Sequence, residues 1–319
     1  MRSFHGIIGS VMDIIGVGYN CIDRLCTVED YPKEDSSTHI TKLDIQGGGA
    51  AATALVAASR LGKDVCFIGN IGKDSVSKEI KDLLEKDGVD TSKLIARDDA
   101  IGLQSFVMIN PANGSRTKFP QKDMNPDIEW TRDLKKTIGK AKVIHLDGTN
   151  HANAMAAARI AKEQGVLVSL DGASLKEPNE VNLELARLAD ILIMNYRYPL
   201  RVTGKTDYDE ALLEIASWGT AKIVAGTQGD KGCKAVIDGH IEYFPAYPVK
   251  AVDTTGAGDV FHGAFIAGYL DSMDIRTNFR FASAVAALKC TGVGGRDPIP
   301  TKEQALEFMK KNEREMYRS

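Results

Sequence analysis

Short apolar runs alternate with alanine-rich helical stretches along most of the chain. The apolar runs predict strands over residues 13–18, 65–69, 143–146, 166–170, 191–194 and 223–225. Apolar positions at helical spacing predict helices over residues 50–61, 75–87, 153–164, 208–218, 256–270, 279–290 and 304–315. This alternation is typical of βαβ crossovers and indicates an α/β fold with a mainly parallel central sheet. Because the runs VIHL, ILIM and IVAG are almost free of polar positions, we expect helices on both faces of that sheet, giving three layers.

Two segments interrupt this rhythm with alternating apolar and polar positions. Residues 38–44 and 102–119 are typical of strands with one exposed face, and Asn113-Gly114 in the second is a strong hairpin signal. We interpret segments 36–46 and 100–122 as a small β lid beside the main sheet. Since no linker rich in Pro, Gly or Ser divides the chain, we expect residues 1–319 to form a single domain.

Composition and charge narrow the class of protein. The chain has 319 residues, of which 43% are hydrophobic and 26% charged, as in ordinary globular proteins. Its net charge of -3 and the lack of a long basic run argue against nucleic acid as the main partner. No apolar run reaches the roughly 18 residues of a membrane span. The five scattered cysteines show no metal spacing, so we expect reduced, mostly buried thiols in a cytoplasmic protein.

The most informative segment reads V-D-T-T-G-A-G-D-V-F and covers residues 252–261. It predicts an extended segment that ends where a helix starts. Small residues let the backbone approach a ligand, and the free N–H groups of a helix start attract anions. Gly256, Ala257 and Gly258 are therefore a candidate anion hole, and Asp259 beside them a candidate acceptor of an alcohol proton. The alternative is a tight turn whose acid only complements the helix dipole.

A second glycine-rich segment, G-G-G-A-A-A-T-A at residues 47–54, opens the helix predicted over residues 50–61. It superficially matches the dinucleotide pattern G-x-G-x-x-A. That pattern needs an acidic residue at the end of the next strand, where this chain has Ile68-Gly69-Asn70. The sequence therefore disfavours a dinucleotide-dependent oxidoreductase. A helix packed closely through Gly and Ala stays open as a structural explanation.

The string D-T-T-G-A-G-D-x-F-x-G-A, residues 253–264, resembles residue for residue the C-terminal signature of the ribokinase-like (PfkB) family of sugar kinases. The resemblance covers nearly the whole chain, from about residue 18 to about residue 300. It implies a three-layer ribokinase-like fold, ATP and Mg²⁺ as cofactors, and transfer of the ATP γ-phosphoryl group to a sugar hydroxyl. The subgroup that the chain resembles most is that of the sulfofructose and ketohexose kinases.

The family's catalytic roles fall on one short stretch of this chain. In the family, the final Asp of the signature is the base and the G-A-G amides form the anion hole. The resemblance therefore assigns the base to Asp259 and the anion hole to Gly256, Ala257 and Gly258.

Two segments resemble the sugar-binding parts of the family. G-x-x-x-x-D ends at Asp23, whose counterpart binds adjacent sugar hydroxyls, as a carboxylate can. G-G-x-x-x-N is matched by Gly48 and Gly49, but Thr53 stands where Asn is usual. This departure leaves the identity of the sugar open. For Asp23 taken alone, the alternative is a solvated loop acid.

An anionic sugar would require a cationic partner on the protein. Arg116 resembles the arginine of the family's G-x-R lid motif and is expected to reach such a group; the alternative is a solvated turn cation. Lys33, Lys118 and Lys122 are further candidates.

On the nucleotide side, Thr227, Gly229 and Gly232 match the family's T-x-G-x-x-G loop, which lies along the ATP phosphates. Asn195 matches the first residue of the family's N-x-x-E segment. Tyr198 replaces its Glu, which helps to order magnesium, so the protein ligands of Mg²⁺ are not readable from the sequence.

The resemblance also implies a monovalent cation, potassium in many relatives, next to the anion hole. Asp253 and the carbonyl of Thr255 match part of that site, and backbone of residues 291–295 would complete it. His262 follows Asp259 by three positions and shares its helix face. His262 is expected to tune the base, Asp259, or to contact the nucleotide. The alternative is that it is simply packed in the helix.

The expected partners are a small sugar and ATP, with the lid as a candidate surface for a homodimer. A nucleoside kinase of the same fold is the alternative within the class, and it would need an apolar slot for the base. A non-catalytic sugar sensor is the alternative outside it, which the presence of Asp259 disfavours.

Overall fold

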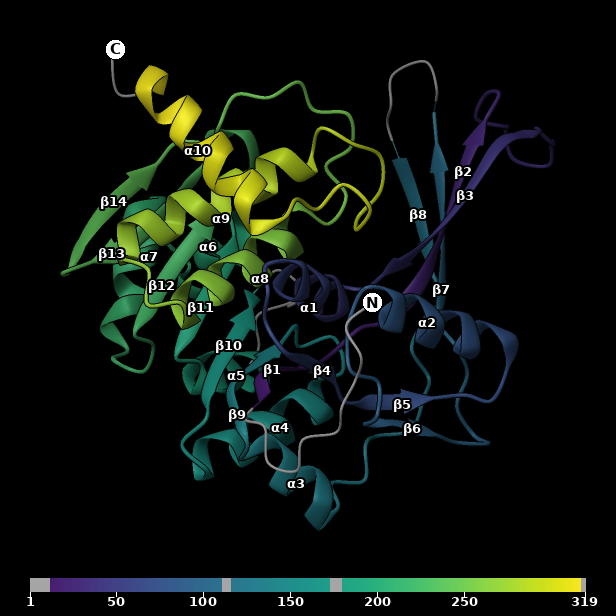
Figure 1. Cartoon of the computed structure of the whole chain (residues 1–319), viewed down its shortest axis with the longest axis horizontal. Coiled ribbons are helices and arrows are strands. Elements are labelled where there is room, and N and C mark those ends of the chain that lie inside the picture. Colours follow the sequence, from purple (N-terminus) through teal and green to yellow (C-terminus); the bar gives the residue numbers. More distant parts are fainter. Residues whose placement is uncertain (1–11, 111–115, 173–179, 317–319) are drawn as a thin grey trace.

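A mixed sheet of eight strands forms the middle layer of the protein (Figure 1). The computed structural model describes residues 12–110, 116–172 and 180–316. In spatial order the main sheet consists of β14 (His240–Phe244), β13 (Cys233–Ile237), β12 (Ile223–Thr227), β11 (Ile191–Asn195), β10 (Leu167–Asp171), β9 (Ala141–Leu146), β1 (Met12–Val17) and β4 (Val65–Phe67). Neighbouring strands from β12 to β4 run parallel, whereas β13 and β14 are antiparallel.

Helices cover both faces of this sheet, which confirms the predicted three-layer α/β architecture. One face carries α1 (Ala50–Arg60), α2 (Ser75–Lys86), α8 (Ala257–Leu270), α9 (Ile275–Lys289) and α10 (Lys302–Met316). The other carries α3 (Arg132–Ile138), α4 (His151–Glu163), α5 (Glu180–Leu188), α6 (Arg197–Thr203) and α7 (Tyr208–Ser217).

The strands have unbroken apolar runs because helices bury the sheet on both faces, as strand β11 illustrates. Ile191 and Ile193 enter the core on the α8 and α9 face, whereas Leu192 and Met194 enter the core on the α4 and α7 face. Successive side chains of a strand point to opposite sides, so a sheet buried on both faces needs apolar residues at every position.

A second sheet stands beside the main one (Figure 1). Its strands, in order, are β3 (Ile40–Gly48), β2 (Cys21–Val28), β7 (Gln104–Ile109) and β8 (Arg116–Pro120). A small two-stranded sheet, β5 (Gly69–Ile71) with β6 (Leu94–Ala96), lies near its base. The hairpin expected at Asn113-Gly114 falls outside the described residues.

Several predicted elements differ from the structure. Strand β2 was not predicted, because the adjacent charges of Asp23 and Arg24 interrupt its alternation, yet it is an inner strand of the second sheet. The antiparallel pair β13 and β14 was also missed. Helix α9 begins at Ile275, before the predicted residue 279, because the Asp274 carboxylate caps its first turn. The predicted strand 65–69 is divided into β4 and β5.

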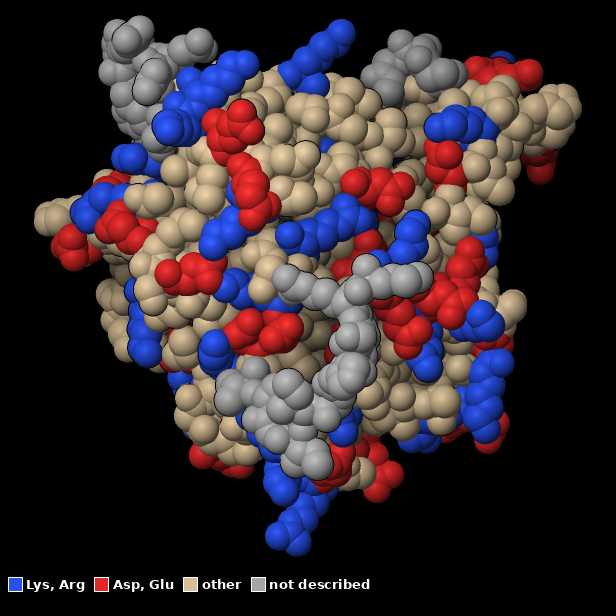
Figure 2. Space-filling view, in the orientation of Figure 1, with Lys and Arg blue, Asp and Glu red and all other residues tan. Residues whose placement is uncertain are grey.

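All five cysteines are buried and unpaired, as expected. Among the residues that the structure describes, no helix is both long and apolar enough to cross a membrane. On the face shown in Figure 2, acidic and basic side chains are intermixed, without a broad patch of one sign.

Candidate functional site

The glycine-rich turn before α8 places the first residues of that helix, Ala257 and Gly258, on the wall of a cavity. Gly256 has the left-handed backbone angle φ +73°, which glycine adopts without strain, and its carbonyl accepts the helical bond from the Val260 amide at 2.9 Å. Asp259 lies in the first helical turn. The turn therefore brings Gly256, Ala257 and Gly258 together with Asp259, at a helix end whose N–H groups and dipole favour an anion.

The carboxyl group of Asp259 has an unusual affinity for protons. Burial, followed by the negative charge of Asp171, raises its pKa to about 7, although the positive charges of His262 and Lys118 oppose the shift. A carboxyl group that titrates near neutrality is well matched to proton transfer from an alcohol.

Behind Asp259 lies a buried pair, His262 and Asp171. The Nε2 of His262 lies 3.3 Å from Asp171 Oδ1, and both side chains are at most 5% exposed. Burial opposes a charge on His262, but the Asp171 carboxylate overcomes this effect and raises its pKa. His262 is therefore neither a plain apolar packing residue nor a surface group: it places a positive charge one turn from Asp259.

Two more buried polar side chains complete this layer. The His145 ring lies 5.5 Å from the ring of His262, and burial and the His262 charge lower its pKa to about 3, so it stays neutral. Asp147 accepts hydrogen bonds from the amides of Tyr19 (2.7 Å), Ala51 (3.1 Å) and Thr149 (2.9 Å). It thereby joins the loop after β1 to the start of α1.

Sequence reasoning missed Asp147, Asp171 and His145. A signal was present, because Asp147 directly follows strand β9 and Asp171 ends strand β10. Polar residues at the carboxyl ends of parallel strands meet at one edge of the sheet, where α/β proteins place their ligands.

The second sheet carries the predicted substrate-binding acid, Asp23, on strand β2. Asp23 on β2 packs its carboxylate against the Cα of Gly48, so that any side chain at residue 48 would collide with it. Burial raises the pKa of Asp23, with Lys118 and Arg296 opposing the shift. The positive charge of Lys118 lowers the pKa of both Asp23 and Asp259, against the effect of burial.

Arg296 lies beneath the glycine-rich start of α1 and is 2% exposed. Its Nη2 donates to the Gly48 carbonyl at 2.6 Å, and its Nε to the Thr53 hydroxyl at 3.3 Å. Thr53 is buried with its hydroxyl engaged in this way, whereas Gly49, at φ +97°, precedes the helix in a conformation that suits glycine. The sugar-binding roles of Thr53 and Gly49 stay predictions, and the role of Arg296 was not anticipated.

Arg116 joins the second sheet to the loop before α8. Its guanidinium donates to Asp253 Oδ1 and to the hydroxyls of Thr254 and Thr255. This ion pair lies across the cleft rather than on a solvated turn. A contact between Arg116 and an anionic substrate stays a prediction.

A cavity of about 380 Å³ lies on the other side of the anion hole. It brings the predicted loop residues Thr227, Gly229 and Gly232 next to Ala257 and Gly258. The rest of its wall is mainly apolar: Ala246, Tyr247, Pro248, Val249, Ala251, Phe261, Ala286 and Ala287. An apolar slot that opens onto helix N–H groups suits a flat ring carrying a polyphosphate.

Asn195 does not line this cavity. Its side-chain oxygen accepts from the amides of Arg197 and Tyr198, both at 3.0 Å, and so caps α6. Tyr198, which stands in place of the family's Glu, is buried at 3% exposure. Within the described ranges, no cluster of three His, Cys, Asp or Glu side chains could hold a metal ion.

The predicted potassium ligands are engaged by an ammonium group instead. Lys289 Nζ donates to the carbonyls of Asp253, at 2.8 Å, and Thr255. The Asp253 carboxylate accepts from the amides of Thr255 (2.8 Å) and Gly294 (2.9 Å) and from Arg116. These oxygens therefore do not fit the expected monovalent cation, because hydrogen-bond donors already surround them.

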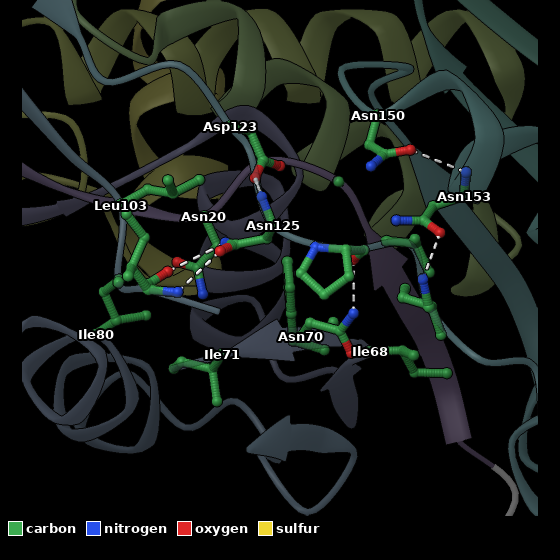
Figure 3. A pocket seen from close by; sticks show the side chains of 18 residues that line it. Asn20, Ile68, Asn70, Ile71, Ile80, Leu103, Asp123, Asn125, Asn150 and Asn153 are labelled. Atoms are coloured by element: carbon green, nitrogen blue, oxygen red, sulfur yellow. Dashed lines mark hydrogen bonds between the residues drawn. The ribbon is translucent and has the colours of Figure 1, made fainter. Parts of the chain in front are cut away.

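A smaller cavity of about 50 Å³, lined by both carboxamide and apolar side chains, lies at the base of the second sheet (Figure 3). Asn70 donates to the Pro126 carbonyl at 2.7 Å, and Asn125 exchanges hydrogen bonds with the backbone of Ile101. The Oδ1 atoms of Asn20 and Asn70 are buried without a protein partner among the described residues. The space accommodates a few water molecules that would satisfy them, and the carboxamides mainly tie loops together.

Comparison with known proteins places this geometry in a family. The model of the pfkB family carbohydrate kinases matches residues 12–302. The nucleoside kinase of Methanothermobacter thermautotrophicus is 29% identical over 92% of this chain and 94% of its own. Probable fructokinase-3 of Arabidopsis thaliana is 30% identical over 93% and 91%. The structure of Arabidopsis thaliana ribokinase complexed with ribose and ATP superposes with a TM-score of 0.83 over 94% and 99%, at 24% identity, and so shares the fold.

The raised pKa of Asp259 predicts a stability effect. Between pH 4 and about 7 the folded protein holds a proton that the unfolded chain has lost, so the contribution of this group to stability falls as the pH rises through that window. Asp259→Asn should therefore raise the melting temperature at pH 8, and the gain should shrink towards pH 4.5.

Asp133→Asn is the matched control, because Asp133 also lies in a first helical turn and its pKa is lowered by Lys93. It should lower the melting temperature slightly at pH 8. If Asp259→Asn behaved in the same way, the raised pKa would be wrong.

Proposed function

The chain belongs to the pfkB family of carbohydrate kinases, and from this premise we propose that it phosphorylates a hydroxyl of a small sugar, a ketohexose or related monosaccharide, with Asp259 as base. Membership makes it an ATP-dependent sugar or nucleoside kinase. The observation that carries the proposal is the position of Asp259. It directly follows the anion-hole residues that line the apolar cavity, and it shares Lys118 with Asp23 across the cleft.

The proposed reaction needs one proton acceptor and one site for negative charge. A sugar hydroxyl gives its proton to the Asp259 carboxylate while its oxygen forms a bond to the γ-phosphorus. The bond between that phosphorus and the β-γ bridging oxygen breaks, and ADP leaves with the electron pair. The N–H groups around Gly256, Ala257 and Gly258 stabilise the charge on the transferred group, and Lys118 adds a positive charge nearby.

The nucleotide is assigned to the 380 Å³ cavity. Its apolar wall receives the adenine, and Thr227, Gly229 and Gly232 lie along the phosphates. Asn195 shapes this side indirectly, by capping α6 next to Thr227. When bound, Mg²⁺ would neutralise the phosphate charge, held mainly by phosphate oxygens and water, since the described residues offer no ready metal cluster.

A sugar suits the substrate side better than a nucleoside. The groups that face this space, Asp23, Lys118 and the Gly48 and Gly49 backbone, are polar, and a nucleobase would need an apolar slot. The cavity beside Asn20 is small, at about 50 Å³. An ADP-release screen over ribose, fructose, sulfofructose, tagatose, ketodeoxygluconate, fructose phosphates and nucleosides tests the choice. Turnover with nucleosides alone would overturn it.

Asp259→Asn tests the base. The amide keeps the size of the side chain but cannot take a proton, so kcat with the best sugar should fall by roughly 10²–10⁴. ATP affinity, measured by calorimetry, should hold or improve because a negative charge beside the phosphates is lost. Asp133→Asn should leave kcat unchanged. If Asp259→Asn kept a near-native kcat, Asp259 would not be the catalytic base.

Asp23→Asn tests the sugar side of the cleft. A carboxylate that accepts from two hydroxyls is replaced by an amide with one oxygen, so KM for the sugar should rise by about tenfold or more. KM for ATP should stay within about twofold, because the nucleotide cavity lies beyond the anion hole. An equal loss of affinity for both substrates would contradict the placement of Asp23.

We further propose that the second sheet forms a homodimer. Its outer face exposes the large apolar side chains Ile40, Leu43, Ile45, Phe106 and Phe119. In the strand register Ile45 and Phe106 both pair with Arg24, and Phe119 pairs with Phe106, so the three apolar residues lie in one row with Arg24. Within this row the Arg24 guanidinium is held by Gln104 and Glu79. A second copy that buries this row would remove it from water.

Phe119→Lys should convert a dimer into a monomer in sedimentation velocity, because it places a charge in the buried row. Tyr243→Lys on β14 is the control, since Tyr243 is equally exposed, at 55% against 56%, but lies on the main sheet. A native protein that sediments as a monomer at micromolar concentration would refute the dimer.

A further inference from the structure

Lys289 is a buried cation at the end of helix α9. Its side chain is 0% exposed, although lysine is among the residue types least often buried. The ammonium donates to two carbonyl oxygens, those of Asp253 and Thr255, from the loop that precedes α8. An apolar residue would fill a core position at far lower cost than a desolvated charge, so this lysine requires an electrostatic reason.

The surroundings of Lys289 concentrate negative potential at one point. Helix α9 ends here, and its last carbonyls carry the negative end of the helix dipole. The Cys290 carbonyl accepts from the amides of Val252, at 2.7 Å, and Asp253, at 3.2 Å, which docks the loop onto the helix end. The Asp253 carboxylate adds a negative charge, which it shares with Arg116, although burial lowers the pKa of Lys289. The end of α9 and the start of α8 thus meet around the ammonium.

This contact reaches the anion hole through one peptide group. The Thr255 carbonyl belongs to the same planar amide as the N–H of Gly256. A cation that binds the carbonyl oxygen fixes the plane of that amide and polarises it, which strengthens its N–H as a donor. Lys289 therefore controls the first donor of the G-A-G turn without itself facing the cleft.

We propose that Lys289 is a positioning residue that supplies, from within the chain, the positive charge that a monovalent cation would otherwise provide at the anion hole. The enzyme then works without potassium. The proposal rests on the proposed kinase function for its kinetic consequences, but its structural consequences are independent of any substrate.

The first test uses the native enzyme. ADP release, melting temperature and ATP affinity by calorimetry are measured in KCl, NaCl and choline chloride at equal ionic strength. Each quantity should be the same in the three salts, with turnover within about twofold, because the charge is already present. A tenfold or larger stimulation by KCl over choline chloride, or a rise in melting temperature specific to KCl, would overturn the proposal.

The second test removes the charge. In Lys289→Met, turnover should fall by about tenfold or more, since small misplacements at a reacting centre have effects up to about 10²-fold. KCl should restore part of this loss and raise the melting temperature, whereas choline chloride should do neither. Lys289→Arg should retain more turnover than Lys289→Met and stay insensitive to potassium. Turnover of Lys289→Met equal to that of the native enzyme would also overturn the proposal.

Lys63→Met is the matched control, because Lys63 is largely buried and pairs with Asp271 at the opposite end of α8. It should lower the melting temperature without changing turnover or creating a response to potassium. If Lys289→Met does not fold, the proposal is tested by the salt series on the native enzyme and on Lys289→Arg. A stimulation specific to KCl in either protein would overturn it. If no sugar is turned over, the melting and calorimetric responses to potassium still decide about Lys289, separately from the proposed function.

Discussion

The junction between the end of α9 and the start of α8 is the constraint on which the site depends. Two helix ends of opposite polarity meet there, and the loop of Asp253–Thr255 passes between them with its carbonyls on Lys289 and its amides on the Asp253 carboxylate. The left-handed Gly256 then redirects the chain into α8. Because the carbonyls of Asp253 and Thr255 and the Thr255 amide all have partners, the loop is held in place before any ligand arrives, as electrostatic catalysis requires.

Burial, followed by the negative charge of Asp171, explains why Asp259 holds its proton so strongly. Asp171 lies at the end of a parallel strand and is too deeply buried to be screened by water, so its charge acts directly on Asp259. His262 between these layers partly compensates. Such an arrangement of like charges destabilises the folded state and is retained where it serves a reaction.

The second sheet contributes to the site in two separate ways. Lys118 moderates the raised pKa of Asp23, whereas Arg116 bridges from β8 to the loop before α8. The bridge couples the position of this sheet to the loop that Lys289 and Asp253 organise. The second sheet and the start of α8 are thereby connected by an ion pair rather than by backbone alone.

The sequence by itself determined the class of fold and predicted the reacting stretch. Both are local properties: the apolar period reports which faces of each element are buried, and the turn from Gly256 to Asp259 is contiguous. Strand β2 was not predicted, because its position in the sheet depends on pairing with β3 and β7 and not on alternating apolar and polar residues in its own sequence. The roles of Lys289 and Arg296 could not be predicted from the sequence either. Their partners, the carbonyls of Asp253 and Gly48, lie 36 and 248 residues away along the chain. Whether a charged side chain is solvated or buried against a carbonyl depends on what packs around it, and only the tertiary structure decides that.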